Sequence, residues 1–141
     1  MSELIIHTSF VSPMTMKLLI GRQILPIFIL RNIRNSEVIG KYSDSVIHFK
    51  ELSPSNELFQ AKRDKKISLE EFKRRYREEI IGLNFPKIIK RWEELSNISN
   101  SLGIALLGYG GNSEICHRSV LSDILNSSGL LNNKIEEIKW K

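Results

Sequence analysis

Cysteine is almost absent from the chain: among 141 residues there is one, Cys116. A single cysteine excludes a disulfide within the chain and any zinc or iron–sulfur cage that needs several cysteines, so we expect a free thiol. Long apolar runs are absent as well. The longest, residues 24–30, is too short for a membrane span, which requires about 20 residues in a helix. The amino terminus lacks the basic and long apolar regions of a secretion signal, so we expect a cytoplasmic protein with no membrane partner.

Proline and glycine are also scarce, with four and eight residues. Together with 41% hydrophobic and 26% charged residues, this composition is typical of a folded soluble protein and excludes a largely disordered chain. A length of 141 residues, with no internal repeat or linker-like stretch, predicts one domain over residues 1–141. The net charge of +5 would attract phosphates but is also common in proteins that never bind nucleic acid.

Strand and helix patterns alternate along the chain. Residues 3–9 have the β-branched bias of a strand, and residues 12–21 form a helix capped by Ser12. Residues 25–31 are apolar on both faces, as in a buried strand, where Pro26 is tolerated only near the beginning. The alternation predicts an α/β domain with three layers: a short, mostly parallel sheet flanked by about five helices.

The second half of the chain predicts helices over 53–63, 68–80, 84–102 and 117–128, with a short central strand at 103–109. Ser53 should cap the first of these helices, and Ser68 with Glu71 forms a capping box for the second. The expected inward residues are Leu69, Phe72, Tyr76 and Ile80, then Ile88, Trp92, Leu95 and Ile98, and finally Val120, Leu121, Ile124 and Leu125. The tail at 134–140 fits a last strand or a short helix equally well.

Basic residues cluster in three runs, at 61–66, 74–77 and 87–91. In the middle run, spacing by four residues predicts the ion pairs Glu70–Arg74, Glu71–Arg75, Arg74–Glu78 and Arg75–Glu79. Such pairs describe a solvated helix face, so this run favours solubility over nucleic-acid binding. The other two runs leave contact with phosphates open.

The stretch GYGGNSEICHRS, residues 108–119, joins the central strand to the last long helix. In open α/β sheets, ligands bind where a strand turns into a helix, because the helix amino terminus presents unpaired N–H groups and partial positive charge. Arg118 would add a permanent cation in the first turn, and Tyr109, Gly110 and Gly111 would form the loop around the ligand. This arrangement favours an anionic ligand, such as a phosphorylated, nucleotide-like molecule.

Cys116 allows two interpretations. The field of the helix, with His117 and Arg118 beside it, could lower the pKa of the thiol and make it a nucleophile, while Arg118 holds the anion and His117 moves a proton. Alternatively, Cys116 is a small buried hydrophobe. If both residues are helical, His117 projects about 100° away from Cys116, which weakens a Cys-His dyad. The stretch matches neither the C-x(5)-R loop of cysteine phosphatases nor a P-loop, and no motif indicates a cofactor or metal.

Further residues could reach the same crevice. Arg31 and Arg34 lie at and just beyond the end of the buried strand at 25–31, so they would reach this edge if that strand runs parallel to 103–109. His7, Thr8 and Ser9 end the first strand and could face the same side. The alternative for both arginines is that they only make the following loop soluble.

The segments ELSPSNELFQAKRDKKISLEEFKRRYREEI, IALLGYG and ICHRSVL together resemble the bacterial and phage family catalogued as domain of unknown function 488. The residues that match the family pattern are Pro54, Ser55, Phe72, Tyr76, Cys116, His117 and Arg118. The chain departs from the family at Gly108 and Gly110, where members often have cysteine and glutamate, although Tyr109 keeps the aromatic residue. The resemblance implies an α/β fold and a pocket, but no reaction.

Three hypotheses for function follow. The first is a protein that binds a small anionic, phosphorylated nucleotide-like ligand near Cys116, His117 and Arg118, with thiol chemistry if it is an enzyme. The second is an accessory protein that binds nucleic acid through its basic runs. The third is a phage- or defence-related interaction protein with a vestigial pocket, which the loss of cysteine and glutamate at 108 and 110 would suit. The sequence leaves the oligomeric state open.

Overall fold

The computed structural model of the chain describes residues 2–29, 47–108 and 117–139. Within these residues it contains a five-stranded sheet in the order β3-β2-β4-β1-β5, and every strand pair is parallel. The strands are β1 (Ile6–Phe10), β2 (Ile24–Phe28), β3 (Ile47–His48), β4 (Gly103–Gly108) and β5 (Glu136–Glu137). The predicted α/β class and parallel sheet are therefore confirmed.

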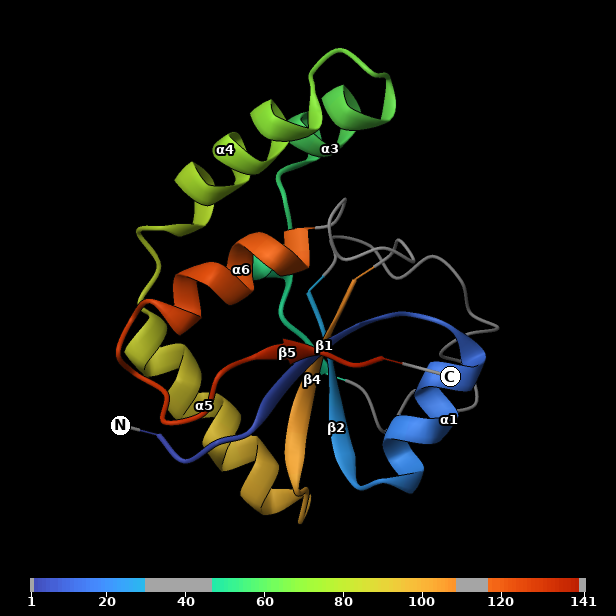
Figure 1. The fold of residues 1–141 in the computed structure, drawn as a ribbon, viewed down its shortest axis with the longest axis vertical. Coiled ribbons are helices and arrows are strands. Elements are labelled where there is room, and N and C mark those ends of the chain that lie inside the picture. The colour runs from blue at the N-terminus through green and yellow to red at the C-terminus, as the bar shows by residue number, and fades with distance from the viewer. Residues whose placement is uncertain (1, 30–46, 109–116, 140–141) are drawn as a thin grey trace.

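Helices cover both faces of the sheet (Figure 1). The helices of the described residues are α1 (Pro13–Gly21), α3 (Asn56–Arg63), α4 (Leu69–Ile80), α5 (Phe85–Ile98) and α6 (His117–Asn126). Among the described helices, α1 covers one face, whereas α5 and α6 lie on the other. The hairpin of α3 and α4 lies beyond α6 and packs against it through α4.

Strand β4 is the centre of the core because both of its faces are covered. Ile104 and Leu106 pack in the cluster that contains α5 and α6, whereas Ala105 and Leu107 pack in the cluster that contains α1. All six residues of the strand are buried. This double burial explains why residues 103–108 are apolar without alternation.

We expected a proline to be tolerated only near the beginning of β2, but the sheet accepts Pro26 further in. It lies in the middle of β2, opposite Ala105, rather than near the beginning of the strand. The N–H of Ile29 donates to Leu107 of β4 at 3.0 Å, so alternation along the strand turns the nitrogen of Pro26 away from β4. The described pairing with β3 starts only at Ile27, so no described ladder hydrogen bond is lost at Pro26.

The helix starts follow local capping chemistry. The predicted caps at Ser12 and Ser68 are confirmed, because each hydroxyl accepts a hydrogen bond from a backbone N–H three residues later. The predicted cap at Ser53 is wrong. Ser53 follows a 3₁₀ turn at residues 50–52 and donates to the carbonyl of Lys50, and Ser55 caps α3 instead. Two serines flank Pro54, and α3 begins directly after the second of them.

Helix α5 buries a different face from the predicted one. The buried residues are Phe85, Ile89, Trp92 and Ser96. Trp92 belongs to both stripes, but the helix is rotated so that Ile88 and Leu95 are only partly buried and Ile98 is 76% exposed. The ring of Trp92 is fully buried and meets Phe49 edge-on, with the ring centroids 5.8 Å apart.

The carboxyl-terminal elements match the predictions that the sequence made for them. All four predicted inward residues of α6 are buried, and they are Val120, Leu121, Ile124 and Leu125. The tail, which the sequence left open, adds β5 as an edge strand beside β1. Among the described residues, no helix has the length and apolar character needed to cross a membrane.

The rotation of α5 gives a stability prediction. We expect Ile89→Ala to lower the free energy of unfolding by about 2–5 kcal/mol, because it leaves a cavity in the core. We expect Ile98→Ala, the same deletion on the exposed side, to change it by less than about 0.5 kcal/mol. Urea denaturation of both variants measures the difference, and equal losses would contradict this assignment of the buried face.

Candidate functional site

The carboxyl edge of the sheet contains a topological switch point between β1 and β4. The chain leaves β1 towards α1 on one face and leaves β4 towards α6 on the opposite face (Figure 1). The two strands are neighbours, with Phe10 opposite Gly108 at their carboxyl ends. In open α/β sheets, a crevice forms outside the strands at such a point, and ligands bind there.

The carbonyl of Gly108 joins three elements at this edge. It accepts a hydrogen bond from the N–H of Val11 at 3.1 Å and another from Nη1 of Arg118 at 3.2 Å. Val11 directly follows β1, and Arg118 is the second residue of α6. The ends of β1 and β4 and the start of α6 are therefore held together through one backbone oxygen.

The side chain of Arg118 lies inside the protein, at 0% exposure. Its Nη2 forms an ion pair with Oε2 of Glu137 at 3.0 Å, and Oε1 of Glu137 accepts from the hydroxyl of Thr8 at 2.6 Å. A buried guanidinium requires such a counter-charge, because an unpaired charge in the interior costs several kcal/mol. The predicted direct contact of Arg118 with a ligand stays a prediction, but its described partners are parts of the protein.

Sequence reasoning placed Thr8 at the end of the first strand, where it could face this side, but it missed Glu137 as a member of the cluster. A signal for Glu137 existed in the tail, because residues two apart on a strand share a face. Ile135 is buried, so a strand here places Glu137 on the inward side as well. Because the sequence left the tail open between a strand and a helix, it did not place the carboxylate of Glu137.

His117 begins α6 and is also buried. Its Nε2 lies 2.6 Å from the carbonyl of Ile29, and because a carbonyl can only accept, the ring donates there. The ring also meets Tyr76 edge-on, with centroids 5.2 Å apart, and Tyr76 donates to the carbonyl of Leu52. His117 therefore ties α6 to the end of β2 and to α4. Its predicted role in proton transfer remains untested.

The other predicted site residues divide into two groups. Ser9 lies near the carboxyl end of β1 as expected, but its side chain is buried and its hydroxyl lies 3.5 Å from the carbonyl of Phe10. Arg31, Arg34, Tyr109, Gly110, Gly111 and Cys116 lie outside the described residues. The parallel pairing of β2 with β4, on which the prediction for the two arginines depended, is confirmed.

The amino termini of α1 and α6 both lie at this edge. Ser12 caps α1, with its hydroxyl accepting from the N–H of Thr15 at 3.0 Å. The residues before α6 lie outside the described ranges. The first-turn amides of any helix lack partners inside the helix and give its amino terminus a partial positive charge. Together with the permanent charge of Arg118, this partial charge makes the start of α6 positive.

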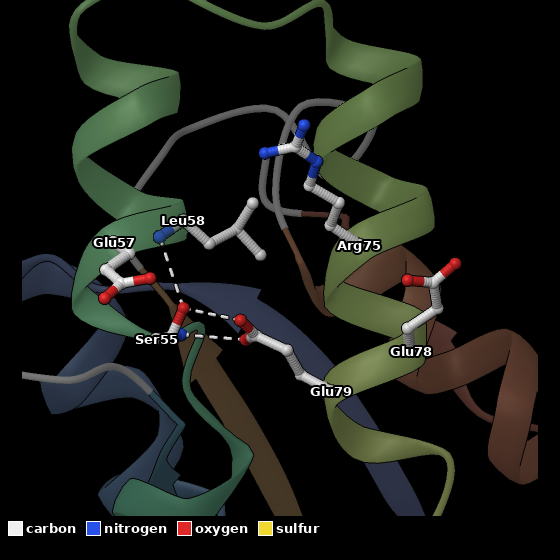
Figure 2. Close-up of a pocket in the computed structure, with 6 residues that line it drawn as sticks. All are labelled: Ser55, Glu57, Leu58, Arg75, Glu78 and Glu79. Carbon is white, nitrogen blue, oxygen red and sulfur yellow. Dashed lines mark hydrogen bonds between the residues drawn. The ribbon is translucent and has the colours of Figure 1, made fainter.

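A groove of about 360 Å³ separates α3 from α4 (Figure 2). Its lining residues are Ser55, Glu57, Leu58, Arg75, Glu78 and Glu79. Glu79 accepts hydrogen bonds from both the N–H and the hydroxyl of Ser55, so it joins α4 to the start of α3. The predicted pair Arg75–Glu79 is therefore wrong, because Ser55 has taken the carboxylate.

The remaining charges of α4 are paired along the helix. The predicted pairs Glu71–Arg75 and Arg74–Glu78 are confirmed. Arg74 pairs with Glu71 rather than with Glu70. Hydrogen bonds from Arg74 and Arg75 lower the pKa of Glu71 below its ordinary value. These groups are exposed, as expected for a solvated helix face.

No three His, Cys, Asp or Glu side chains of the described ranges come together in a way that could hold a metal ion. The described part of the site instead offers one buried cation, one carboxylate, a hydroxyl and backbone amides. Groups of this kind bind or orient an anion and can move a proton.

These features define an α/β protein with a parallel sheet whose carboxyl edge carries a topological switch point. The profile of the family DUF488-N3a, described as the active DUF488-N3 subclade, matches residues 28–129, which is more than half of the chain. The chain therefore belongs to the DUF488 family, as the resemblance of its motifs predicted. No curated protein and no solved structure shows a significant match.

A second histidine, His7, lies on β1 opposite Glu136 of β5. Burial lowers the pKa of His7 below its ordinary value, and the nearby charge of Glu136 opposes this only in part. The folded protein therefore takes up a proton at His7 less readily than the unfolded chain does.

This difference gives a pH prediction. Below the ordinary histidine pKa, the unfolded chain binds more protons than the folded one, so stability falls as the pH drops through about 6.5 towards the lower folded pKa. We expect His7→Gln to flatten this decline in urea midpoints between about pH 5 and pH 8. His48→Gln, at an exposed position on β3, is the control and should keep the wild-type slope. An unchanged slope in His7→Gln would exclude His7 as the cause.

Proposed function

We propose that the chain binds a small anionic, phosphorylated, nucleotide-like ligand at the carboxyl edge of its sheet, in front of α6. The observation that carries the proposal is the switch point between β1 and β4, where α6 begins with a guanidinium beneath its first turn. A crevice at a switch point is where α/β proteins bind ligands, and a helix amino terminus selects negative charge.

Charge outside the described residues adds to this support. Arg31 and Arg34 follow β2 in the sequence, and β2 is parallel and adjacent to β4. Both arginines therefore come after a strand that ends at the same edge of the sheet as β4. The net charge of +5 would also raise the local concentration of anions. Glu137 neutralises Arg118 in part, so these two arginines and the helix amides are the groups proposed to meet the ligand.

A reaction at Cys116 is the second part of the proposal. Helix α6 begins at His117, so Cys116 directly precedes it in the sequence, a position at which the helix field lowers the pKa of a thiol. The description of the matching subclade as active supports chemistry rather than binding alone. The ion pairs on α4 count against nucleic-acid binding through the middle basic run, because they neutralise Arg74 and Arg75. The runs at 61–66 and 87–91 keep the nucleic-acid alternative open.

Ligand binding can be tested by thermal unfolding with inorganic phosphate and a panel of nucleoside mono-, di- and triphosphates. A true ligand at a hundred times its dissociation constant should stabilise the protein by about 2.7 kcal/mol. The double variant Arg31→Gln/Arg34→Gln should lose most of this gain. The control Arg63→Gln/Arg91→Gln removes the same charge from exposed positions on α3 and α5 and should retain it. Equal losses would indicate unspecific attraction, and a flat response of the wild type would disprove the proposal.

The reactivity of Cys116 gives a separate prediction. The rate of alkylation should rise with pH around a pKa well below the ordinary thiol value of about 8.5. The anion of the panel that stabilises the protein most should slow the alkylation, because it would occupy the space in front of α6. Cys116→Ser is the blank. An ordinary or raised thiol pKa would remove the nucleophile hypothesis while leaving the binding hypothesis intact.

A further inference from the structure

Arg118 already holds an anion, and that anion belongs to the protein. The side chain is fully buried, and its amino groups donate to the carbonyl of Gly108 and to the carboxylate of Glu137. An external anion can reach the two amino groups of this guanidinium only if it takes the place of the partners that they have among the described residues. Glu137 is the partner that carries negative charge among the described residues.

The carboxylate of Glu137 sits in a site built by two separate elements. Thr8 of β1 donates to one carboxylate oxygen at 2.6 Å, and Arg118 of α6 donates to the other at 3.0 Å. Both donors are themselves buried, with exposures of 2% and 0%. A hydroxyl and a guanidinium that converge on two oxygens of one planar anion are the donor set that binds a carboxylate or a phosphate from any source.

The strand that delivers this carboxylate is weakly attached. β5 has two residues and pairs with β1 through two positions at the edge of the sheet. Its last described link is the N–H of Ile138, which donates to the carbonyl of Thr8 at 2.9 Å. The firm anchor lies before the strand, where Ile135 is buried and its N–H donates to the side chain of Asn126. The side chain of Ile138 is only partly buried where it packs against the cluster on the α1 side, so residues 136–138 have fewer core contacts than Ile135.

We propose that Thr8 and Arg118 form an anion-binding subsite whose resident occupant is the carboxylate of Glu137, and that β5 is a displaceable plug of this subsite. An entering phosphate or carboxylate group replaces Glu137 on the same donors, so the charge of Arg118 stays compensated throughout the exchange. The side chain of Glu137 keeps 25% exposure, which gives the carboxylate a path to solvent. The inference rests on the proposed function for its biological ligand, since it describes how that anion would reach Arg118.

The subsite can be tested without any knowledge of the ligand. Glu137→Ala should lower the melting temperature, and formate should restore much of the loss with a saturable dependence, whereas chloride at equal ionic strength should not. Glu136→Ala is the matched control, because it removes an exposed carboxylate from the same strand, and formate should not affect it beyond the chloride baseline. If Glu137→Ala does not fold, Glu137→Gln replaces it. Inorganic phosphate should then bind Glu137→Gln about tenfold more tightly than wild type, because one negative charge beside the anion is removed.

The plug is tested by amide hydrogen exchange of the wild-type protein in phosphate and in chloride. Phosphate should speed exchange at Ile138, whose N–H is released when β5 leaves, and should not change Ile104, whose N–H donates to Ile5 in the core. Bound ligands usually protect amides, so faster exchange at one edge position is a specific sign of displacement.

The outcomes separate the two proposals. The displaceable subsite is overturned if formate and phosphate affect the Glu137 variants no more than the Glu136 variant. It is also overturned if hydrogen exchange at Ile138 is unchanged in phosphate. If formate restores Glu137→Ala and phosphate releases Ile138, while no nucleotide stabilises the wild type, the subsite stands and the nucleotide-like ligand is wrong.

Discussion

The guanidinium of Arg118 has no access to solvent, and this single constraint organises one end of the molecule. A buried cation must be given a counter-charge and hydrogen-bond acceptors, and here they come from three different strands. Gly108 at the end of β4 supplies a carbonyl, Glu137 of β5 supplies the carboxylate, and Thr8 of β1 orients that carboxylate. The start of α6 is therefore fixed over the carboxyl edge by the same contacts that hold the sheet together there.

A second set of contacts extends this arrangement to the outer helices. His117 donates to the end of β2 and packs against Tyr76, whose hydroxyl reaches the backbone before α3. The hairpin of α3 and α4 is thus connected to the first residue of α6 rather than only to the apolar core. Membership of the DUF488 family covers this same region, because the match runs from β2 through α6. In the Cys-His-Arg motif, His117 and Arg118 therefore both make buried contacts that hold α6 against the sheet.

Local features of the fold were predictable because they depend on neighbours in the sequence. A serine cap acts on an amide three residues away, and the buried stripes of α4 and α6 repeat at helical spacing, so the chain itself encodes both. The errors arose where two local solutions compete. Ser53 and Ser55 both flank Pro54, and α5 has two overlapping apolar stripes that share Trp92. Packing against the sheet chose between them.

The sequence by itself determined the α/β class, the helices and the strand-to-helix turn that carries Arg118. Only the tertiary structure decided what Arg118 meets. Thr8 and Glu137 are separated by 129 residues, and nothing in the local pattern states that β1 lies between β4 and β5. Strand order in a parallel sheet results from how long crossover connections pack on its two faces, which is a property of the whole chain. For that reason the start of α6 could be read from the sequence, whereas the partners of Arg118 could not.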